Sequence, residues 1–148
     1  MARLLVFYHS RTGNTQKMAE AVAEGARSVQ GVEVELKTDM EVGPEDLGKA
    51  EATVIGAPTY RHDMSTGIKN LLDETASKQV ATKGKLGACF GSYGWSGEAP
   101  KLVLHAMKEK LQMNIIEIPV QAKNSPSPDD LEKCRDLGRA VSQKLTAP

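Results

Sequence analysis

The sequence predicts an α/β fold in which a five-stranded parallel sheet of order 2-1-3-4-5 carries helices on both faces. Five segments of strand length alternate along the chain with segments of helical period, the pattern of repeated strand–helix–strand units. Three strand segments are continuously apolar and suit the sheet interior, whereas the second alternates with charges and the fifth holds a proline. Right-handed crossovers and these two edge strands favour the stated order.

The composition is that of one globular domain spanning residues 1–148. Hydrophobic residues make up 40% and charged residues 26% of the chain, and 19 basic side chains balance 19 acidic ones. This balance gives no reason to expect nucleic acid or an anionic membrane as a partner. No apolar run approaches the roughly 20 residues of a membrane span, and no signal sequence is recognised. We therefore expect a cytoplasmic protein, in which Cys89 and Cys134 are structural thiols.

Turn-forming residues and hydrophobic periodicity divide the chain into its elements. The expected elements of the first half are a strand at Leu4–Phe7, a helix from Thr15 to about Gln30, an edge strand at Val32–Lys37 and a buried strand at Ala52–Ala57. Those of the second half are a helix begun by Ser65 or Thr66, a buried strand at Leu86–Phe90, a helix with Pro100 in its first turn, an edge strand at Ile115–Val120 and a final helix begun by Ser127 or Asp129.

The loop after the first strand is rich in hydroxyl groups and leads directly into a helix. It offers Ser10, Thr12 and Thr15, together with unpaired backbone N–H groups at the positive end of a helix dipole. Such a place binds anions, including phosphate. The alternative is that Ser10 or Thr12 only caps the helix. The loop is neither GxxxxGK[ST], because the lysine is missing, nor GxGxxG.

Two later loops hold three of the six aromatic residues in the chain. Tyr60 follows the third strand, and Tyr93 and Trp95 follow the fourth. Ligands of such sheets bind beyond the carboxyl ends of the strands, near the switch point between strands one and three. Either these rings flank a planar heterocycle, or Trp95 plugs the end of the sheet and Tyr60 packs on its own loop. Together with the first loop, they predict a site for a mononucleotide with an aromatic ring system.

Three motifs resemble the cofactor loops of the flavodoxin family. Ser10–Thr15 resembles the phosphate loop [ST]-x-T-G-x-T, and Gly56–Tyr60 and Phe90–Gly97 resemble the two flavin-ring loops. The third loop is most similar to that of the flavodoxin-like domain of flavodiiron proteins, the A-type flavoproteins. The resemblance covers essentially the whole chain, and no insertion splits the last strand region. It therefore implies the short-chain type, with a three-layer flavodoxin-like fold.

The same resemblance implies FMN as the cofactor, and no metal. Around the FMN phosphate it places Ser10, Arg11, Thr12, Gly13, Asn14 and Thr15. On one side of the flavin ring it places Pro58, Thr59, Tyr60 and Arg61, and on the other side Ser92, Tyr93, Gly94, Trp95 and Gly97. It assigns no catalytic residue.

Two departures from the family bear on function. Typical flavodoxins are strongly acidic, whereas this chain has no net charge, so a large negative field is not expected to select its partners. Flavodoxins usually place glycine or asparagine where the second loop must turn a peptide over beside the flavin, but no glycine lies between Tyr60 and Met64. Positive φ is costly for other residues, so one-electron storage is expected to be poorer. His62, in the same loop, is a candidate for tuning the flavin.

Two functions of different classes remain open. The first is a flavodoxin, a low-potential electron carrier between redox enzymes, in which the protein supplies positioning and electrostatics. The second is an FMN-dependent NAD(P)H:quinone oxidoreductase, because Ala19–Ala26 also resembles the opening of the flavodoxin-like quinone reductases. We favour the carrier, since the chain lacks the length and third-loop pattern of those reductases. A third idea is a partner subunit for a separately encoded oxidase. The expected partners are redox proteins, with no nucleic acid and no membrane, and the expected state is a monomer or weak dimer.

Overall fold

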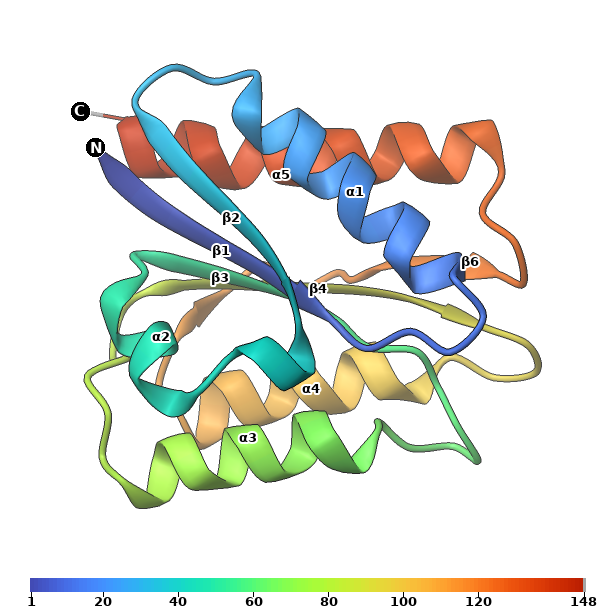
Figure 1. Cartoon of the computed structure of the whole chain (residues 1–148), viewed down its shortest axis with the longest axis horizontal. Helices are drawn as coiled ribbons and strands as arrows, with labels where there is room; N and C mark the ends of the chain where they lie inside the picture. Colours follow the sequence, from blue (N-terminus) through green and yellow to red (C-terminus); the bar gives the residue numbers. More distant parts are fainter. Residues whose placement is uncertain (148) are drawn as a thin grey trace.

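One parallel sheet organises the chain, with helices on both of its faces (Figure 1). The computed structural model describes residues 1–147, so Pro148 of the expected domain lies outside the described residues. The strands are β1 (Ala2–Tyr8), β2 (Val32–Thr38), β3 (Ala52–Gly56), β4 (Leu86–Tyr93), β5 (Asn114–Ile115) and β6 (Val120–Lys123). The helices are α1 (Asn14–Arg27), the 3-10 helix η1 (Asp39–Glu41), α2 (Pro44–Lys49), α3 (Thr66–Ser77), α4 (Glu98–Glu109) and α5 (Pro128–Thr146).

The strand order is β2-β1-β3-β4-β5, and β6 pairs with β4 as well. Every one of these pairings is parallel. The predicted α/β class and strand order are therefore confirmed. Because the strands are parallel, their carboxyl ends meet at one edge of the sheet, on the right in Figure 1, and the loops after β1, β3 and β4 become neighbours.

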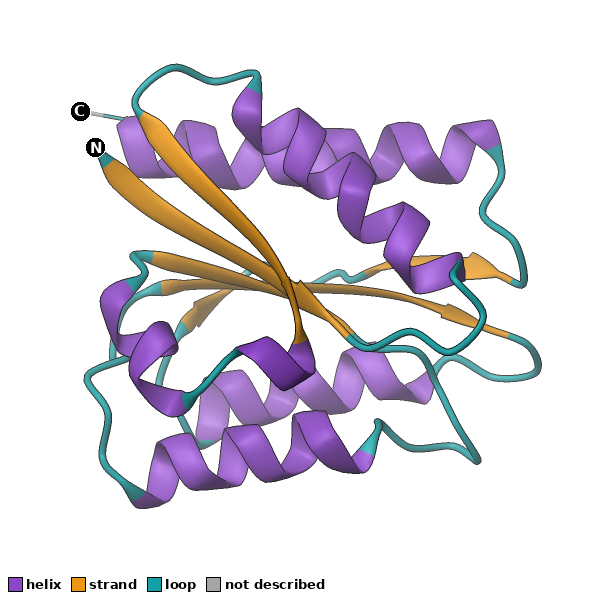
Figure 2. Cartoon of the chain, in the orientation of Figure 1, coloured by secondary structure: helices purple, strands orange, loops and turns teal. Residues whose placement is uncertain are grey.

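Alternate side chains of the central strands point into two separate cores. Leu4 and Val6 of β1 pack in the core beneath α1 and α5, and Leu5 and Phe7 pack in the core with α2, α3 and α4. Figure 2 shows these two helical layers on either side of the strands. All residues of β3 are buried, which explains why its sequence shows no alternation.

Two glycines allow α1 and α5 to pack backbone against backbone. A Cβ atom on Gly25 would lie 1.9 Å from the carbonyl oxygen of Arg135, and one on Gly138 would lie 1.9 Å from that of Val22. The hydroxyl of Ser142 donates to the carbonyl oxygen of Ala26 across the same contact, at 3.0 Å. This contact fixes α1 on the sheet, and the N-terminus of α1 forms part of the site described below.

The last strand differs from the prediction. Only the ends of the expected strand Ile115–Val120 belong to strands: β5 pairs with the start of β4 and β6 pairs with its end. Between them, Ile116 still donates its N–H to the carbonyl oxygen of Gly87 at 2.8 Å, and Glu117–Pro119 then leave the sheet. Pro119 has no N–H to donate to the sheet, and the side chain of Ile118 is 81% exposed. The expectation of one uninterrupted strand is therefore wrong, although the interruption is short.

Two other boundaries are corrected. Strand β4 continues to Tyr93 rather than ending at Phe90, because Phe90–Tyr93 pair with β6. The first helix ends at Arg27, earlier than Gln30. Ser65 caps α3 and Ser127 caps α5, and each side-chain oxygen accepts a backbone N–H, as expected for these positions. Over residues 1–147, no helix has the length and apolar character needed to cross a membrane.

Candidate functional site

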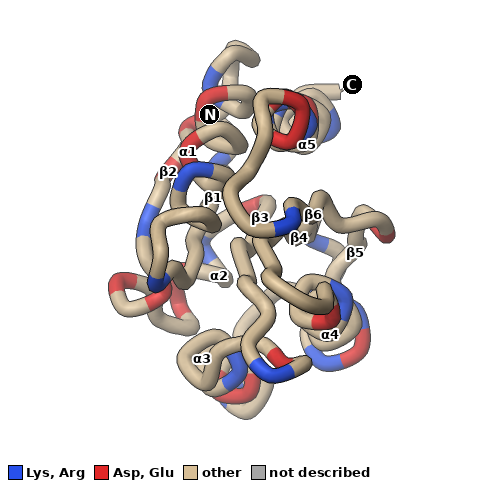
Figure 3. Tube along the Cα trace, turned by 90° about the vertical axis from the view of Figure 1, so that its right-hand side faces the viewer, with Lys and Arg blue, Asp and Glu red and all other residues tan. Residues whose placement is uncertain are grey.

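Three loops at the carboxyl edge of the sheet surround a hollow, which we call the cradle. Figure 3 looks onto this edge, where the loops after β1, β3 and β4 face the viewer. The residues that line the cradle are Ser10, Thr12, Asn14, Thr15, Pro58, Thr59, Tyr60, Ser92, Tyr93, Gly94 and Asn124. All but Asn124 belong to the set predicted from the sequence.

The first loop presents the N-terminus of α1 to the cradle without a side-chain cap. Gly13 is the N-cap residue, its φ is 90°, and no side chain accepts a hydrogen bond there from the helix. Ser10 Oγ instead accepts the N–H of Gly13 itself, at 3.0 Å. The alternative that Ser10 or Thr12 only caps the helix is therefore not supported. The first-turn amides are therefore free to bind an anion. A helix N-terminus stabilises a bound negative charge by about 0.3–1 kcal/mol, and by up to about 2 kcal/mol in partly buried sites.

The second loop forms a tight turn whose two central residues are left-handed. Tyr60 and Asp63 exchange two backbone hydrogen bonds, at 2.8 and 3.0 Å. Between them, Arg61 has a φ of 49° and His62 a φ of 66°. Turns of this kind favour glycine or asparagine, and each other residue costs about 1–2 kcal/mol. The chain thus adopts the positive φ that its sequence disfavours, so contacts elsewhere have to hold this turn.

The aromatic residues do not behave alike. Tyr60 and Tyr93 line the cradle, but Trp95 is 89% exposed and is not among the residues that line it. Trp95 therefore does not plug the end of the sheet. Burial raises the pKa of the Tyr60 phenol above its ordinary value, so this ring is neutral at physiological pH.

A second, larger hollow lies on the outer side of Tyr60, and we call it the outer hollow. Arg11, Arg61 and Trp95 line the outer hollow rather than the cradle. The guanidinium carbon of Arg11 lies 5.0 Å from the centre of the Tyr60 ring. His9, which no motif singled out, meets that ring edge-on, with 5.8 Å between ring centres. Tyr60 is thus a wall shared by both hollows.

Two predicted glycines act through the backbone rather than by lining the cradle. Gly13 supplies the left-handed N-cap described above. A Cβ on Gly97 would lie 2.1 Å from Oε1 of Gln121, and the Gln121 side-chain amide donates to the Gly97 carbonyl at 2.9 Å. Gly97 therefore lets the third loop pack closely against β6.

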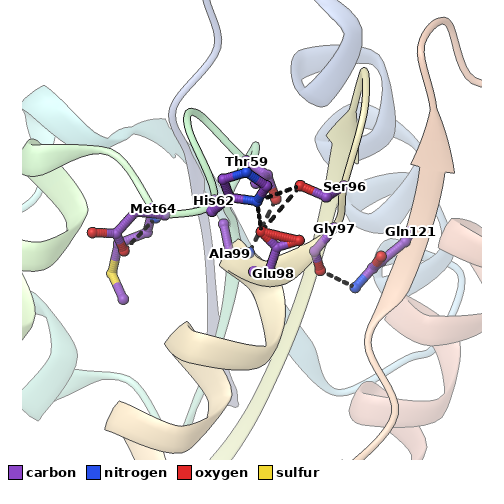
Figure 4. A network of polar contacts seen from close by, with 9 residues as sticks. Thr59, His62, Met64, Ser96, Gly97, Glu98, Ala99 and Gln121 are labelled. Carbon is purple, nitrogen blue, oxygen red and sulfur yellow. Dashed lines mark hydrogen bonds and ion pairs between the residues drawn. The ribbon is translucent and has the colours of Figure 1, made fainter.

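A polar cluster joins the second and third loops (Figure 4). Nδ1 of His62 lies 2.7 Å from Oε2 of Glu98 and 3.0 Å from Oγ of Ser96, and the Ser96 hydroxyl donates to Glu98 at 3.0 Å. The hydrogen bond from Ser96, followed by the contact with His62, lowers the pKa of the Glu98 carboxyl below its ordinary value. Beside the cluster, Thr59 Oγ1 accepts the N–H of Ala99 at 3.0 Å.

Sequence reasoning missed two contributors. Asn124 follows β6, and its N–H donates to the carbonyl oxygen of Tyr93 at 2.7 Å, which places it on the cradle. The polar residue after the last edge strand was the available signal. Asp39, after β2, pairs with Nδ1 of His9 at 3.0 Å. Both follow strands at the same edge of the sheet as the three recognised loops.

The fold and the site together define an α/β protein with a mononucleotide-type cradle at the switch point of its sheet. The chain belongs to the flavodoxin family, because the family model described as Flavodoxin matches residues 6–138. FMN is the cofactor of this family, which confirms the predicted cofactor. The residues on the cradle fit that group, since hydroxyls and uncapped helix amides lie at one side and tyrosine rings at the other.

Individual proteins support the same assignment. The chain is 38% identical over 148 residues to the Type A flavoprotein fprA of Rhodobacter capsulatus; the match covers 97% of this chain but spans only a third, 33%, of that protein. It is 32% identical over 160 residues to the flavodoxin of Aquifex aeolicus, covering 97% of this chain and 86% of that protein. A solved flavodoxin from the domain Archaea is 34% identical, with a TM-score of 0.88 and coverage of 97% and 98% of the two chains. The predicted likeness to both flavodoxins and A-type flavoproteins is confirmed.

Proposed function

We propose that the protein is a flavodoxin-type carrier that holds FMN in the cradle and passes electrons between redox enzymes. One observation carries this proposal: a single hollow joins the hydroxyl-rich N-terminus of α1 to the rings of Tyr60 and Tyr93. A terminal phosphate suits the first part and a planar ring the second.

Each part of the cradle has a distinct task in this proposal. Ser10, Thr12, Asn14 and Thr15, with the first-turn amides of α1, hold the phosphate through hydrogen bonds that serve an anion. Tyr60 and Tyr93 orient the ring and exclude water from it. When bound, FMN supplies electron transfer in single or paired steps, and the protein tunes the potential through the surrounding dipoles and charges. Arg11 and Arg61 face the outer hollow, where an electron partner approaches.

The partners we propose are redox proteins. One such partner that we propose is an oxidase. The matched region is about a third of the length of the relative fprA, so the activity of that whole protein is not carried over to this chain. The absence of net charge in the whole sequence favours docking by shape and local contacts over long-range electrostatic steering. We also propose that the protein works in a reducing compartment, where Cys89 and Cys134 stay as free thiols.

The cofactor itself provides the direct test. The purified protein is expected to be yellow, and the compound released on denaturation is expected to have the mass of FMN. Titration of the cofactor-free protein with FMN and with riboflavin should then show a clear preference for FMN, because only FMN carries the phosphate. FAD, or no flavin binding at all, would refute the proposal.

The exposed position of Trp95 favours a second candidate, an NAD(P)H:quinone oxidoreductase. A reductase of this kind needs an open face beside the flavin, and the outer hollow is open next to Tyr60. Steady-state oxidation of NADPH with benzoquinone separates the two functions. A carrier should give no turnover beyond that of free FMN, whereas tens of turnovers per second would identify the reductase.

A further inference from the structure

The turn at Arg61–His62 is held in a conformation that its own residues disfavour. Both φ angles are positive, neither residue is glycine or asparagine, and the turn closes through the two hydrogen bonds between Tyr60 and Asp63. Such strain persists only where surrounding structure determines the conformation. The nearest candidate for that support is the polar cluster of His62, Ser96 and Glu98.

The proton positions in this cluster follow from its geometry. Glu98 Oε2 receives the hydroxyl hydrogen of Ser96, and a carboxylate only accepts. The short contact from His62 Nδ1 to the same oxygen therefore requires hydrogen on Nδ1. That hydrogen also points toward Ser96 Oγ, which still has a lone pair to accept it. All three groups are satisfied at once while His62 is in its left-handed conformation.

We propose that His62, Ser96 and Glu98 form a latch that fixes the Arg61–His62 turn against the N-terminus of α4, and so positions the second loop beside the flavin ring. The latch acts with Thr59, whose hydroxyl accepts the N–H of Ala99 and ties the start of the same loop to the same helix (Figure 4). His62, Ser96 and Glu98 are positioning residues, because none of them lines the cradle.

The proposed effect of the latch on the flavin rests on the proposed function. Its effect on the Arg61–His62 turn does not depend on FMN and can be measured in the cofactor-free protein. His62 and Glu98 are 65% and 39% exposed, so their replacement leaves the buried cores intact. Glu98→Gln keeps the shape of the side chain and removes its charge, and His62→Asn keeps a residue that tolerates positive φ but removes the ring.

Amide hydrogen exchange at Tyr60 and Asp63 in the cofactor-free protein is the first readout. Each variant is expected to speed this exchange about threefold, the scale of one partly exposed hydrogen bond. The double variant is expected to lose little more than either single variant, since both weaken the same contact. His105→Asn and Glu109→Gln replace exposed residues of α4 and are expected to leave the exchange unchanged.

The midpoint potential of bound FMN is the second readout. Glu98→Gln and His62→Asn should shift it in the same direction, and the double variant should shift it no further. Unchanged exchange in both single variants, or fully additive effects in the double variant, would overturn the latch. Failure of the wild-type protein to bind FMN would instead overturn the proposed function, and the exchange measurement would still decide on the latch.

Discussion

The hydroxyl oxygens of Thr15 and Ser92 lie 2.8 Å apart and join the first turn of α1 to the end of β4. The N–H of Ser92 also points to Thr15 Oγ1, at 3.4 Å. Both residues are buried, although they stand 77 positions apart in the sequence. The loop that presents the phosphate site is thereby fastened to the strand that presents Tyr93.

This contact predicts a measurable loss of stability. Thr15→Val should lower the free energy of unfolding by about 1–2 kcal/mol, because it leaves the buried hydroxyl of Ser92 without a partner. Thr15→Ser keeps the hydroxyl and serves as the control. Urea unfolding of Thr15→Val, Ser92→Ala and the double variant should show losses that do not add. Additive losses would mean that the two hydroxyls act independently.

Thr12 offers a test of the phosphate site that does not disturb the fold. Its side chain lines the cradle and is exposed, so Thr12→Ala should change stability by no more than about 0.5 kcal/mol. Loss of a hydrogen bond to a charged phosphate should weaken FMN binding about 10- to 100-fold. Riboflavin lacks the phosphate, and its affinity should stay nearly the same. Fluorescence titrations with both flavins decide the matter, and equal weakening would place the phosphate elsewhere.

Thr53 in β3 provides a site where a substitution should stabilise the protein. Its hydroxyl is fully buried and has no hydrogen-bond partner among the described residues. Thr53→Val removes the unsatisfied oxygen without changing the volume much, and should raise the free energy of unfolding by about 1 kcal/mol.

The matched control is the same substitution at Thr82. That hydroxyl is also buried but donates to the carbonyl oxygen of Leu111 at 2.8 Å, so Thr82→Val should lower the free energy of unfolding by about 1 kcal/mol. Thermal unfolding should therefore move in opposite directions for the two variants. A decrease in both would show that Thr53 has a partner in solution.

The buried thiols predict how stability depends on pH. Burial raises the pKa of Cys134 to about 12 and raises that of Cys89 further, whereas an unfolded thiol ionises near pH 8.5. The contribution of these two thiols to the free energy of unfolding is thus complete below about pH 8.5. It is lost as the pH rises toward the pKa values of the folded protein, because in this range only the unfolded chain releases the thiol protons. Between pH 9 and pH 10 each thiol should contribute a decrease approaching 1.4 kcal/mol per pH unit.

Urea unfolding at a series of pH values measures this slope. Cys134→Ala and Cys89→Ala should each flatten it, whatever their effect on stability at neutral pH. Iodoacetamide at pH 8 should alkylate neither cysteine in the folded protein and both in urea, because the reaction requires the thiolate. Rapid labelling of the folded chain, or an unchanged slope, would contradict this account.

Much of the fold follows from local pattern. The continuous apolar runs of β1, β3 and β4 and the charged alternation of β2 are enough to assign interior and edge strands. The break at Ile116–Pro119 could not be read in the same way, because four of the six residues Ile115–Val120 are aliphatic and suggest one strand. Whether an edge strand continues depends on pairing with β4, which only the three-dimensional arrangement determines.

The cradle was largely predictable because its residues come from three contiguous motifs. The positions of Arg11 and Trp95 were not, since the direction of a loop side chain depends on its neighbours and not on its own motif. The turn at Arg61–His62 was expected to be unfavourable for lack of glycine, and its conformation became explicable only through Glu98 of a distant helix. Asn124 could not be predicted either, because it belongs to none of the three motifs and reaches the cradle only through the fold.

The interrupted strand at the far side of the sheet also limits how much of that edge is open to strand addition. An open edge invites strand addition, and long edges of this kind lead to aggregation. Here the edge offers only the two residues of β5 and the four of β6, and between them lie the exposed Ile118 and also Pro119, which has no N–H. The opposite edge, β2, carries Glu33, Glu35 and Lys37. Neither edge presents a long apolar strand, so addition of a strand from another copy is disfavoured at both edges of the sheet.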